Sequence, residues 1–235
     1  MVEPELSEAI EDQFLEFSST KSGDRATIER LAGFFLGNLL KEKVPVAQQV
    51  VQVVIRAADL LYADGFIDSL AQATDAEALP ADIGVTCYWN EYHRLSAEAP
   101  LPDIAPLYRE YHALEKGGVD VTALVTSGLS EPAAISGNLR RVRERTGSTH
   151  LLVVTSTATQ EEIDILADYL SEDRIYDARL LLGADPSVQH RLRRLLPQIA
   201  SENVPDNSYT YPSFLDGLHE RYGEYRANRM AGFGP

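Results

Sequence analysis

The amino-acid sequence predicts an α/β protein in which an N-terminal helical region precedes a mostly parallel four-strand βαβ layer and a C-terminal helix. Two observations carry this prediction. Apolar residues recur at helical spacing up to about residue 79, whereas after Pro80 short β-branched segments alternate with amphipathic ones, a pattern typical of parallel βαβ units. We therefore expect a helical region over 1–79, a Rossmann-like α/β domain over 80–202, and a linker with a C-terminal helix over 203–235.

The N-terminal region is expected to be helical throughout. Asp24 can cap a helix that ends before Pro45, and a second helix is predicted over Val46 to Tyr62, followed by a short one up to Leu79. Each prediction depends on apolar residues that fall on one side of a helix. These residues are Ile10, Phe14, Leu15 and Phe17, then Ile28, Leu31, Phe35, Leu36, Leu39 and Leu40, then Val50, Val51, Val54, Ala57, Ala58 and Leu61.

The α/β part is expected to alternate strands with helices. Its strands are predicted over 83–89, 119–125, 150–155 and 175–182. The helices are predicted from about 106 to 116, over 131–145, over 160–170 and over 188–200, with a last helix from Ser213 to about Met230. Crossovers between parallel strands are right-handed, so these helices should cover the sheet.

Acidity is the strongest compositional signal, because 36 acidic and 21 basic residues give a formal charge of −15. Residues 1–118 carry 20 acids and 9 bases (−11), and residues 119–235 carry 16 and 12 (−4). A dense carboxylate surface stays hydrated and soluble in a cytoplasm of high salt concentration, so we expect a halophilic protein. The alternative is a merely acidic protein from a GC-rich genome, in which arginine codons replace lysine codons. The charge also argues against non-specific nucleic-acid binding, which needs a basic face.

The location expected for the protein is cytoplasmic. The only cysteine is Cys87, so no disulfide can form within the chain, and the N-terminus is acidic where an export signal would be basic. Charged and amide residues interrupt the apolar stretches before they reach the roughly 20 residues that a membrane helix needs. We therefore expect no membrane span.

Two predicted strand ends lead into loops that suit an anionic ligand. Hydroxyl side chains and backbone N–H groups at such loops, close to helix N-termini, bind phosphate or carboxylate groups. A further loop, Gly183 to Pro186, follows the last strand. The alternative is ordinary capping, for which the same residue types are used. The candidate ligand residues are Thr126, Ser127, Gly128 and Ser130 in the first loop, and Thr155, Ser156 and Thr157 in the second.

The segment from Asp120 to about Leu170 loosely resembles the second half of a sugar isomerase (SIS) phosphosugar-binding domain. In that family a strand leads into a Ser/Thr-Gly loop and a long helix, and the next strand ends in a Thr-Ser pair. The resemblance implies that Thr126, Ser127, Ser130, Thr155 and Ser156 bind phosphate. It covers about a fifth of the chain, and the glycine-rich loop that such domains place after their first strand is replaced by Cys87 to His93.

Cys87 and His93 are the candidates for catalysis, because a thiol beside an imidazole can act as nucleophile and base. Cysteine on a strand is more often a buried apolar residue, and we assign no catalytic residue. His93, His112 and two glutamates, Glu91 and Glu115, form a local cluster without a known metal-ligand spacing, so we assign no metal site. Nucleotide and hydrolase motifs with glycine-rich or histidine signatures are not found.

Two features favour protein contacts. The predicted helix over 131–145 carries four arginines in six residues, which either pair with the protein's own carboxylates or dock an acidic partner. The C-terminal helix carries an aromatic stripe, which packs either on the sheet or on another chain. The partner-binding candidates are Arg140, Arg141, Arg143, Arg145, Phe214, Leu218, Tyr222 and Tyr225.

Three functions follow as hypotheses. The first is a non-catalytic binding or assembly protein that works through protein contacts, in a homo-oligomer or a larger complex. The second is an α/β domain, regulatory or enzymatic, that binds a small anion such as a phosphosugar or a nucleotide. The third is an enzyme that depends on Cys87 and His93. The sequence identifies no cofactor.

Overall fold

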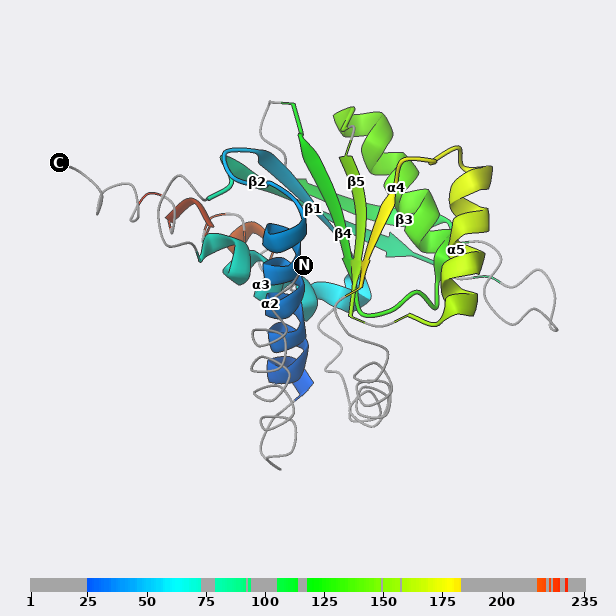
Figure 1. The fold of residues 1–235 in the computed structure, drawn as a ribbon, viewed down its shortest axis with the longest axis horizontal. Helices are drawn as coiled ribbons and strands as arrows, with labels where there is room; N and C mark the ends of the chain where they lie inside the picture. The colour runs from blue at the N-terminus through cyan, green and yellow to red at the C-terminus, as the bar shows by residue number, and fades with distance from the viewer. Residues whose placement is uncertain are drawn as a thin grey trace.

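In the computed structural model, a central β-sheet is covered by helices on both faces (Figure 1). The structure describes residues 25–72, 79–91, 93, 105–113, 118–148, 150–156, 158–182, 215–218, 220, 222–224 and 227. The helices are α2 (Arg25–Lys43), α3 (Leu60–Ala71), α4 (Pro132–Thr146) and α5 (Gln160–Glu172), with a short 3₁₀ turn, η1 (Ala57–Asp59). No helix in this part of the chain is both long and apolar enough to span a membrane.

The sheet has six strands in the order β3-β2-β1-β4-β5-β6. All neighbouring strands are parallel except β2 and β3, which are antiparallel. The strands are β1 (Val50–Arg56), β2 (Asp82–Asn90), β3 (Leu107–Ala113), β4 (Val121–Thr126), β5 (His150–Thr155) and β6 (Arg179–Leu182). The chain thus builds the sheet outward in both directions from a central β1, as doubly wound α/β folds do.

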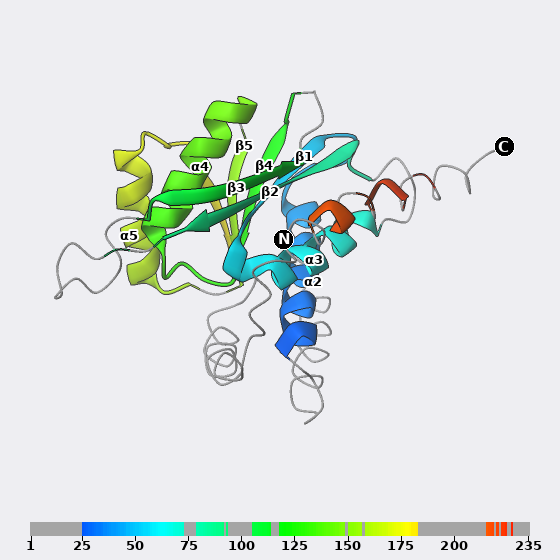
Figure 2. The same ribbon diagram turned by 180° about the vertical axis from the view of Figure 1, so that it is seen from behind.

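Helices α2 and α3 cover one face of the sheet, and α4 and α5 cover the other (Figure 2). The first core contains alternate residues of five strands, such as Val53, Val85 and Ala123, packed against α2 and α3. The second core packs the opposite side chains, including Val54 and Leu124, against α4 and α5. The prediction of an α/β fold is confirmed, whereas the four mostly parallel strands are replaced by a mixed sheet of six.

The predicted helix over Val46 to Tyr62 is wrong, because its first half forms β1 in the centre of the sheet. Helices cover β1 on both faces, and every residue from Val51 to Arg56 is buried. A strand buried on both faces gives a continuous apolar run rather than an alternation. Such a run fits helical and extended spacing equally well, which explains the error.

The predicted helix between Pro106 and Lys116 is also wrong, because residues 107–113 form β3. This strand lies at the edge of the sheet, and none of its residues is fully buried. Arg109 lies over the ring of Trp89 on β2, 5.2 Å from the ring centre, a cation–π contact that holds the edge strand to its neighbour. Edge strands often carry charged residues, which hide the alternation on which sequence reasoning depends.

Helices α2 and α3 approach each other closely through glycines. A methyl group on Gly33 would lie 1.9 Å from the carbonyl oxygen of Tyr62, and one on Gly65 would lie 1.7 Å from that of Arg30. Both distances are far below van der Waals contact. Arg30 also forms ion pairs with Asp64 and Asp68, at 2.7 and 2.9 Å. The helix pair therefore depends on small residues at its centre.

Two further predictions are only partly right: α3 runs without a break through the helix end predicted at Tyr62, and only Arg179–Leu182 of the strand predicted over 175–182 forms a strand, β6. The other predicted elements agree with the structure where it describes them. The strands expected at 83–89, 119–125 and 150–155 correspond to β2, β4 and β5, and the helices expected at 131–145 and 160–170 correspond to α4 and α5. The described residues between Leu215 and Ala227 are helical, and Leu218 and Tyr222 are buried in the first core. Tyr222 Oη donates to the carbonyl oxygen of Pro80 at 2.8 Å. The helix predicted at 188–200 lies outside the described residues.

Candidate functional site

The strand order identifies one place where a doubly wound sheet binds ligands. The chain moves outward from β1 to β2 on one side and from β4 to β5 on the other, and β1 and β4 are neighbours (Figure 1). Ligands of such folds bind outside the carboxyl ends of the two strands where the direction reverses. In this protein these strand ends are Arg56 and Thr126. We call the polar residues around them the switch-point cluster: Arg56, Asp59, Thr126, Ser127, Gly128, Glu131 and Ser156.

Arg56 lies at the centre of the switch-point cluster, with only 4% of the residue exposed. Its Nη2 lies 2.7 Å from the carboxylate of Asp59, which is 1% exposed, and its Nε donates to the same carboxylate at 2.8 Å. Nη2 also donates to Thr126 Oγ1 at 2.6 Å, and Nη1 forms an ion pair with Glu131. The guanidinium therefore joins the end of β1, the end of β4 and the start of α4.

The two predicted anion loops meet at this cluster. Ser127 N donates to Asp59 Oδ1 at 3.0 Å, so the same carboxylate binds both the arginine and the loop after β4. Ser156 Oγ, which follows β5, donates to the carbonyl oxygen of Ser127 at 3.0 Å. Thr126 Oγ1 donates to the carbonyl oxygen of Gly128 at 2.9 Å. The structure thus brings together four of the seven residues predicted to bind a ligand.

The other three predicted ligand residues lie differently. Thr155 is fully buried at the end of β5, and Ser130 is exposed just before α4. Thr157 lies outside the described residues. Their part in binding stays a prediction.

The N-termini of α4 and α5 differ at this end of the sheet. Helix α5 has a complete capping box, in which Thr159 Oγ1 accepts from Glu162 N at 3.0 Å and Glu162 Oε2 accepts from Thr159 N at 2.6 Å. Glu131 occupies the same position before α4 but caps no backbone group, because its carboxylate binds Arg56. A negative group at a helix N-terminus is favourable in either arrangement. Glu131 supplies that group beside α4.

Sequence reasoning missed Arg56, Asp59 and Glu131. Arg56 and Asp59 lie inside the segment predicted as a helix. Charged residues are ordinary on the exposed side of a surface helix, so these two gave no sign of a site. Once residues 50–56 are assigned to a central strand, the signal is present, because a charged residue then ends an otherwise apolar buried run.

A second polar group of residues lies on the α4 side of the sheet, and we call it the polar ladder: Gln52, Thr86, His112 and Glu110. Gln52 Nε2 donates to Thr86 Oγ1 at 2.9 Å, and Thr86 Oγ1 lies 2.9 Å from His112 Nδ1. His112 Nε2 lies 3.4 Å from Glu110, which also binds Arg145 at 2.7 Å. Burial, together with the nearby charge of Arg145, lowers the pKa of His112 below its usual value. The histidine is therefore neutral at pH 7.

The hypothesis of a Cys87 enzyme gains no support from the structure. Cys87 is fully buried in the first core, and burial raises the pKa of its thiol far above the usual range. A nucleophilic cysteine instead needs a lowered pKa and access to solvent. His93 is 47% exposed and lies 3.6 Å from Glu91. Across the part of the chain that the structure describes, no three or more His, Cys, Asp or Glu side chains gather as a metal site would require.

The four arginines of α4 pair with carboxylates of the same chain. Arg140 pairs with Asp173, Arg141 and Arg145 pair with Glu110, and Arg143 lies 3.3 Å from Asp177. Their side chains nevertheless stay between 38% and 56% exposed. Of the aromatic stripe, Leu218 and Tyr222 pack inside their own chain, and Phe214 and Tyr225 lie outside the described residues. Binding of a partner by these residues stays a prediction.

No protein-family model matches the chain, and no curated protein matches it either.

Proposed function

We propose that the protein binds a small anionic molecule, such as a phosphosugar or a nucleotide, at the switch-point cluster. The observation that supports this proposal is the burial of Arg56 and Asp59 at the end of β1, where doubly wound sheets bind their ligands. Charged side chains are almost never fully buried unless they are paired, and burial carries a large desolvation cost. The desolvation cost of burying Arg56 and Asp59 at the position where this fold binds ligands favours a functional role for the two residues.

The chemistry of the cluster fits an anion. A guanidinium offers paired donors to phosphate or carboxylate oxygens. The hydroxyls of Thr126 and Ser156 already donate to backbone carbonyl oxygens, so further donors for a ligand come from the backbone N–H groups at the N-terminus of α4. The three charged side chains, one arginine and two carboxylates, carry a net charge of −1, so a ligand anion must replace a carboxylate rather than add to the cluster.

Glu131 is the carboxylate that a ligand replaces. Its side chain is 28% exposed, whereas that of Asp59 is 1% exposed, so Glu131 is the outer partner of Arg56. It lies where an anion at the N-terminus of α4 would lie, bound to the same guanidinium. In the proposed function, Glu131 occupies the site until a ligand anion takes its place beside Arg56.

The proposal gives no part to Cys87, because the one thiol of the chain is buried and burial raises its pKa. A regulatory role fits a site whose arginine is held by two internal carboxylates when no ligand is bound.

A binding screen with a matched pair of variants tests the proposal. Phosphosugars and nucleotides are added to the protein in molar salt, and a compound at 100 times its dissociation constant should stabilise the fold by about 2.7 kcal/mol. Glu131→Gln should bind the same compound more tightly, because Arg56 then loses a charged competitor. Glu161→Gln, at the N-terminus of the neighbouring helix, should not change the affinity. The absence of a thermal shift in both the wild type and Glu131→Gln would refute the proposal.

Assembly through protein contacts is the second candidate function. It is supported by the exposure of the four arginines of α4, each still more than a third exposed although paired. Light scattering after size-exclusion chromatography in molar salt tests it. A defined oligomer is expected, and a strict monomer at all concentrations would count against assembly of the chain with itself.

A further inference from the structure

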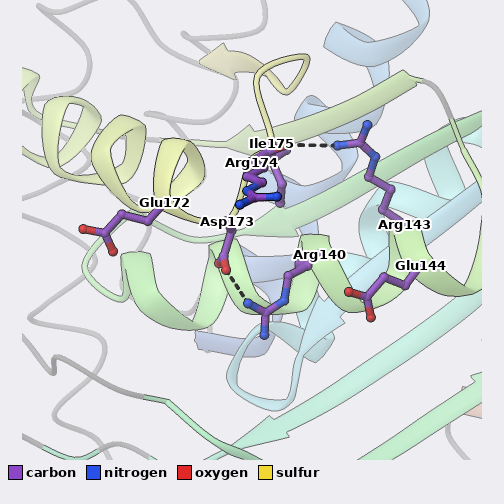
Figure 3. Close-up of a pocket in the computed structure, with 7 residues that line it drawn as sticks. All are labelled: Arg140, Arg143, Glu144, Glu172, Asp173, Arg174 and Ile175. Atoms are coloured by element: carbon purple, nitrogen blue, oxygen red, sulfur yellow. Dashed lines mark hydrogen bonds and ion pairs between the residues drawn. The ribbon is translucent and has the colours of Figure 1, made fainter.

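A hollow lined by both arginines and carboxylates lies between the C-terminal half of α4 and the segment that follows α5. It has a volume of about 400 Å³ and is lined by three arginines, Arg140, Arg143 and Arg174, beside three carboxylates and Ile175 (Figure 3). We call it the arginine hollow. It lies on the α4 and α5 side of the sheet, and none of its lining residues belongs to the switch-point cluster.

Arg174 has an unusual backbone conformation. Helix α5 ends in two hydrogen bonds that close its last turn, from Arg174 N to Ser171 O at 3.0 Å and from Ile175 N to Leu170 O at 2.7 Å. This pattern is a Schellman motif, in which the residue at the position of Arg174 takes a left-handed conformation and is usually glycine. Arg174 has a φ of 59°. Arg174 therefore carries a long side chain at a backbone position that glycine adopts with less strain.

The guanidinium of Arg174 has no carboxylate partner among the residues that the structure describes. Arg140 binds Asp173, whose other oxygen accepts from Ser136 Oγ at 2.7 Å, so Asp173 is fully engaged. Arg143 Nη1 donates to the carbonyl oxygen of Arg174 at 3.4 Å and lies 3.3 Å from the exposed Asp177. Figure 3 shows the carboxylate of Glu172 directed away from the arginines. Arg143 and Arg174 therefore have donors left for an anion.

Stabilisation of the helix end does not explain this arrangement. A cation near a helix C-terminus interacts favourably with the helix dipole. Any position in the last turn of α5 would supply that interaction with an ordinary helical backbone. The left-handed position instead places the arginine beside the hollow, next to Arg143 of the neighbouring helix.

We propose that the arginine hollow binds a small molecule that carries phosphate groups, held by the guanidinium groups of Arg143 and Arg174. Guanidinium groups bind phosphate oxygens through paired hydrogen bonds. The volume falls in the range of small-molecule sites and exceeds what a single phosphate needs. This site is independent of the one at the switch point, so either can exist without the other.

Calorimetric titration of the full chain with pyrophosphate tests this inference. Arg174→Gly should weaken binding by about tenfold or more, because it removes a charge-assisted contact, and Arg174→Lys should weaken it less. Glycine also suits the left-handed backbone, so this variant should fold with equal or higher stability. Gln48→Gly is the control, because Gln48 is the other non-glycine residue with a positive φ, at 58°, in the described chain. It should leave the affinity unchanged.

Two results would overturn the inference. In the first, Arg174→Gly binds pyrophosphate as tightly as the wild type, whatever happens at the switch point. If Glu131→Gln then changes the affinity, pyrophosphate binds at the switch-point cluster, which supports the proposed function and removes the second site. In the second, Gln48→Gly weakens binding as much as Arg174→Gly, and the loss then reflects the backbone rather than the guanidinium.

Discussion

The guanidinium of Arg56 and the carboxylate of Asp59 form an ion pair at 2.7 Å in which neither side chain is more than 4% exposed. The two residues are three positions apart, and η1 turns the chain back so that they meet at the end of β1. Asp59 also accepts from the backbone N–H of Ser127 at 3.0 Å. One buried carboxylate thus fixes both the arginine and the loop that follows β4.

Replacing Asp59 by Asn should destabilise the fold strongly. The substitution keeps the size of the side chain but leaves the buried Arg56 with Glu131 as its only carboxylate partner among those described. Breaking a buried ion pair costs about 3–5 kcal/mol. Asp68→Asn is the control, because Asp68 pairs with the half-exposed Arg30 and should cost about 1 kcal/mol or less. Urea denaturation in molar salt measures the free energy of unfolding of both variants. Equal losses of stability would show that the buried ion pair stabilises the fold no more than the exposed one.

Replacing Gly65 by Ala should destabilise the packing of α2 on α3. The new methyl group would lie 1.7 Å from the backbone oxygen of Arg30, and backbone atoms cannot move aside as a flexible side chain can. The helices must separate, and overpacking of this kind typically costs about 1–3 kcal/mol. Gly137→Ala in α4 is the control, since no atom lies within 4 Å of its added methyl group. It should stabilise the fold by about 0.5–1 kcal/mol, and a thermal unfolding series that ranks the two variants otherwise would contradict this packing.

The stability of the protein should fall as the pH drops through about 6.5, the pKa of histidine in an unfolded chain, because of His112. Burial and Arg145 lower its pKa in the folded state, so below that pH the unfolded chain takes up a proton that the folded chain does not. The contribution is complete above pH 6.5 and is lost at lower pH. His112→Asn should flatten the dependence of unfolding free energy on pH between 5 and 7, as measured by urea denaturation. An unchanged slope would show that His112 titrates normally in the folded state.

Cys87 should react slowly with thiol reagents at neutral pH in the native protein. The side chain is fully buried and its pKa is raised by burial, so neither access nor thiolate is available. The thiol should react quickly once the protein is unfolded in urea. Rapid labelling of the native protein would contradict the buried position of Cys87 and would revive the hypothesis of a cysteine-dependent enzyme.

The sequence predicted the second half of the fold better than the first, for a physical reason. The strands β4 and β5 are as buried as β1, but each is a short apolar run that ends in polar loop residues before its helix begins. Strand β1 instead leads through η1 directly into α3, so that strand and helix form one apolar stretch in the sequence. The central β1 is buried on both faces, which removes the alternation that identifies a strand. The edge strand β3 was missed for the opposite reason, since its exposed and charged residues hide any apolar pattern.

The candidate site was predicted in part. Thr126, Ser127, Gly128 and Ser156 were found because hydroxyl residues at strand ends have a recognisable composition. Arg56, Asp59 and Glu131 were missed. Arg56 ends β1, which was predicted as a helix, and it meets its two carboxylate partners only in the folded protein. Long-range pairs, such as the one between Arg56 and Glu131, leave no local pattern in a single sequence.

A crystal structure of the protein with the tightest-binding phosphosugar or nucleotide tests the central claim most directly. We expect an anionic group of the ligand within hydrogen-bonding distance of the Arg56 guanidinium, with the Glu131 carboxylate displaced and the pair of Arg56 and Asp59 intact. A ligand bound elsewhere, with Glu131 still bound to Arg56, would contradict the claim that the switch-point cluster is the binding site.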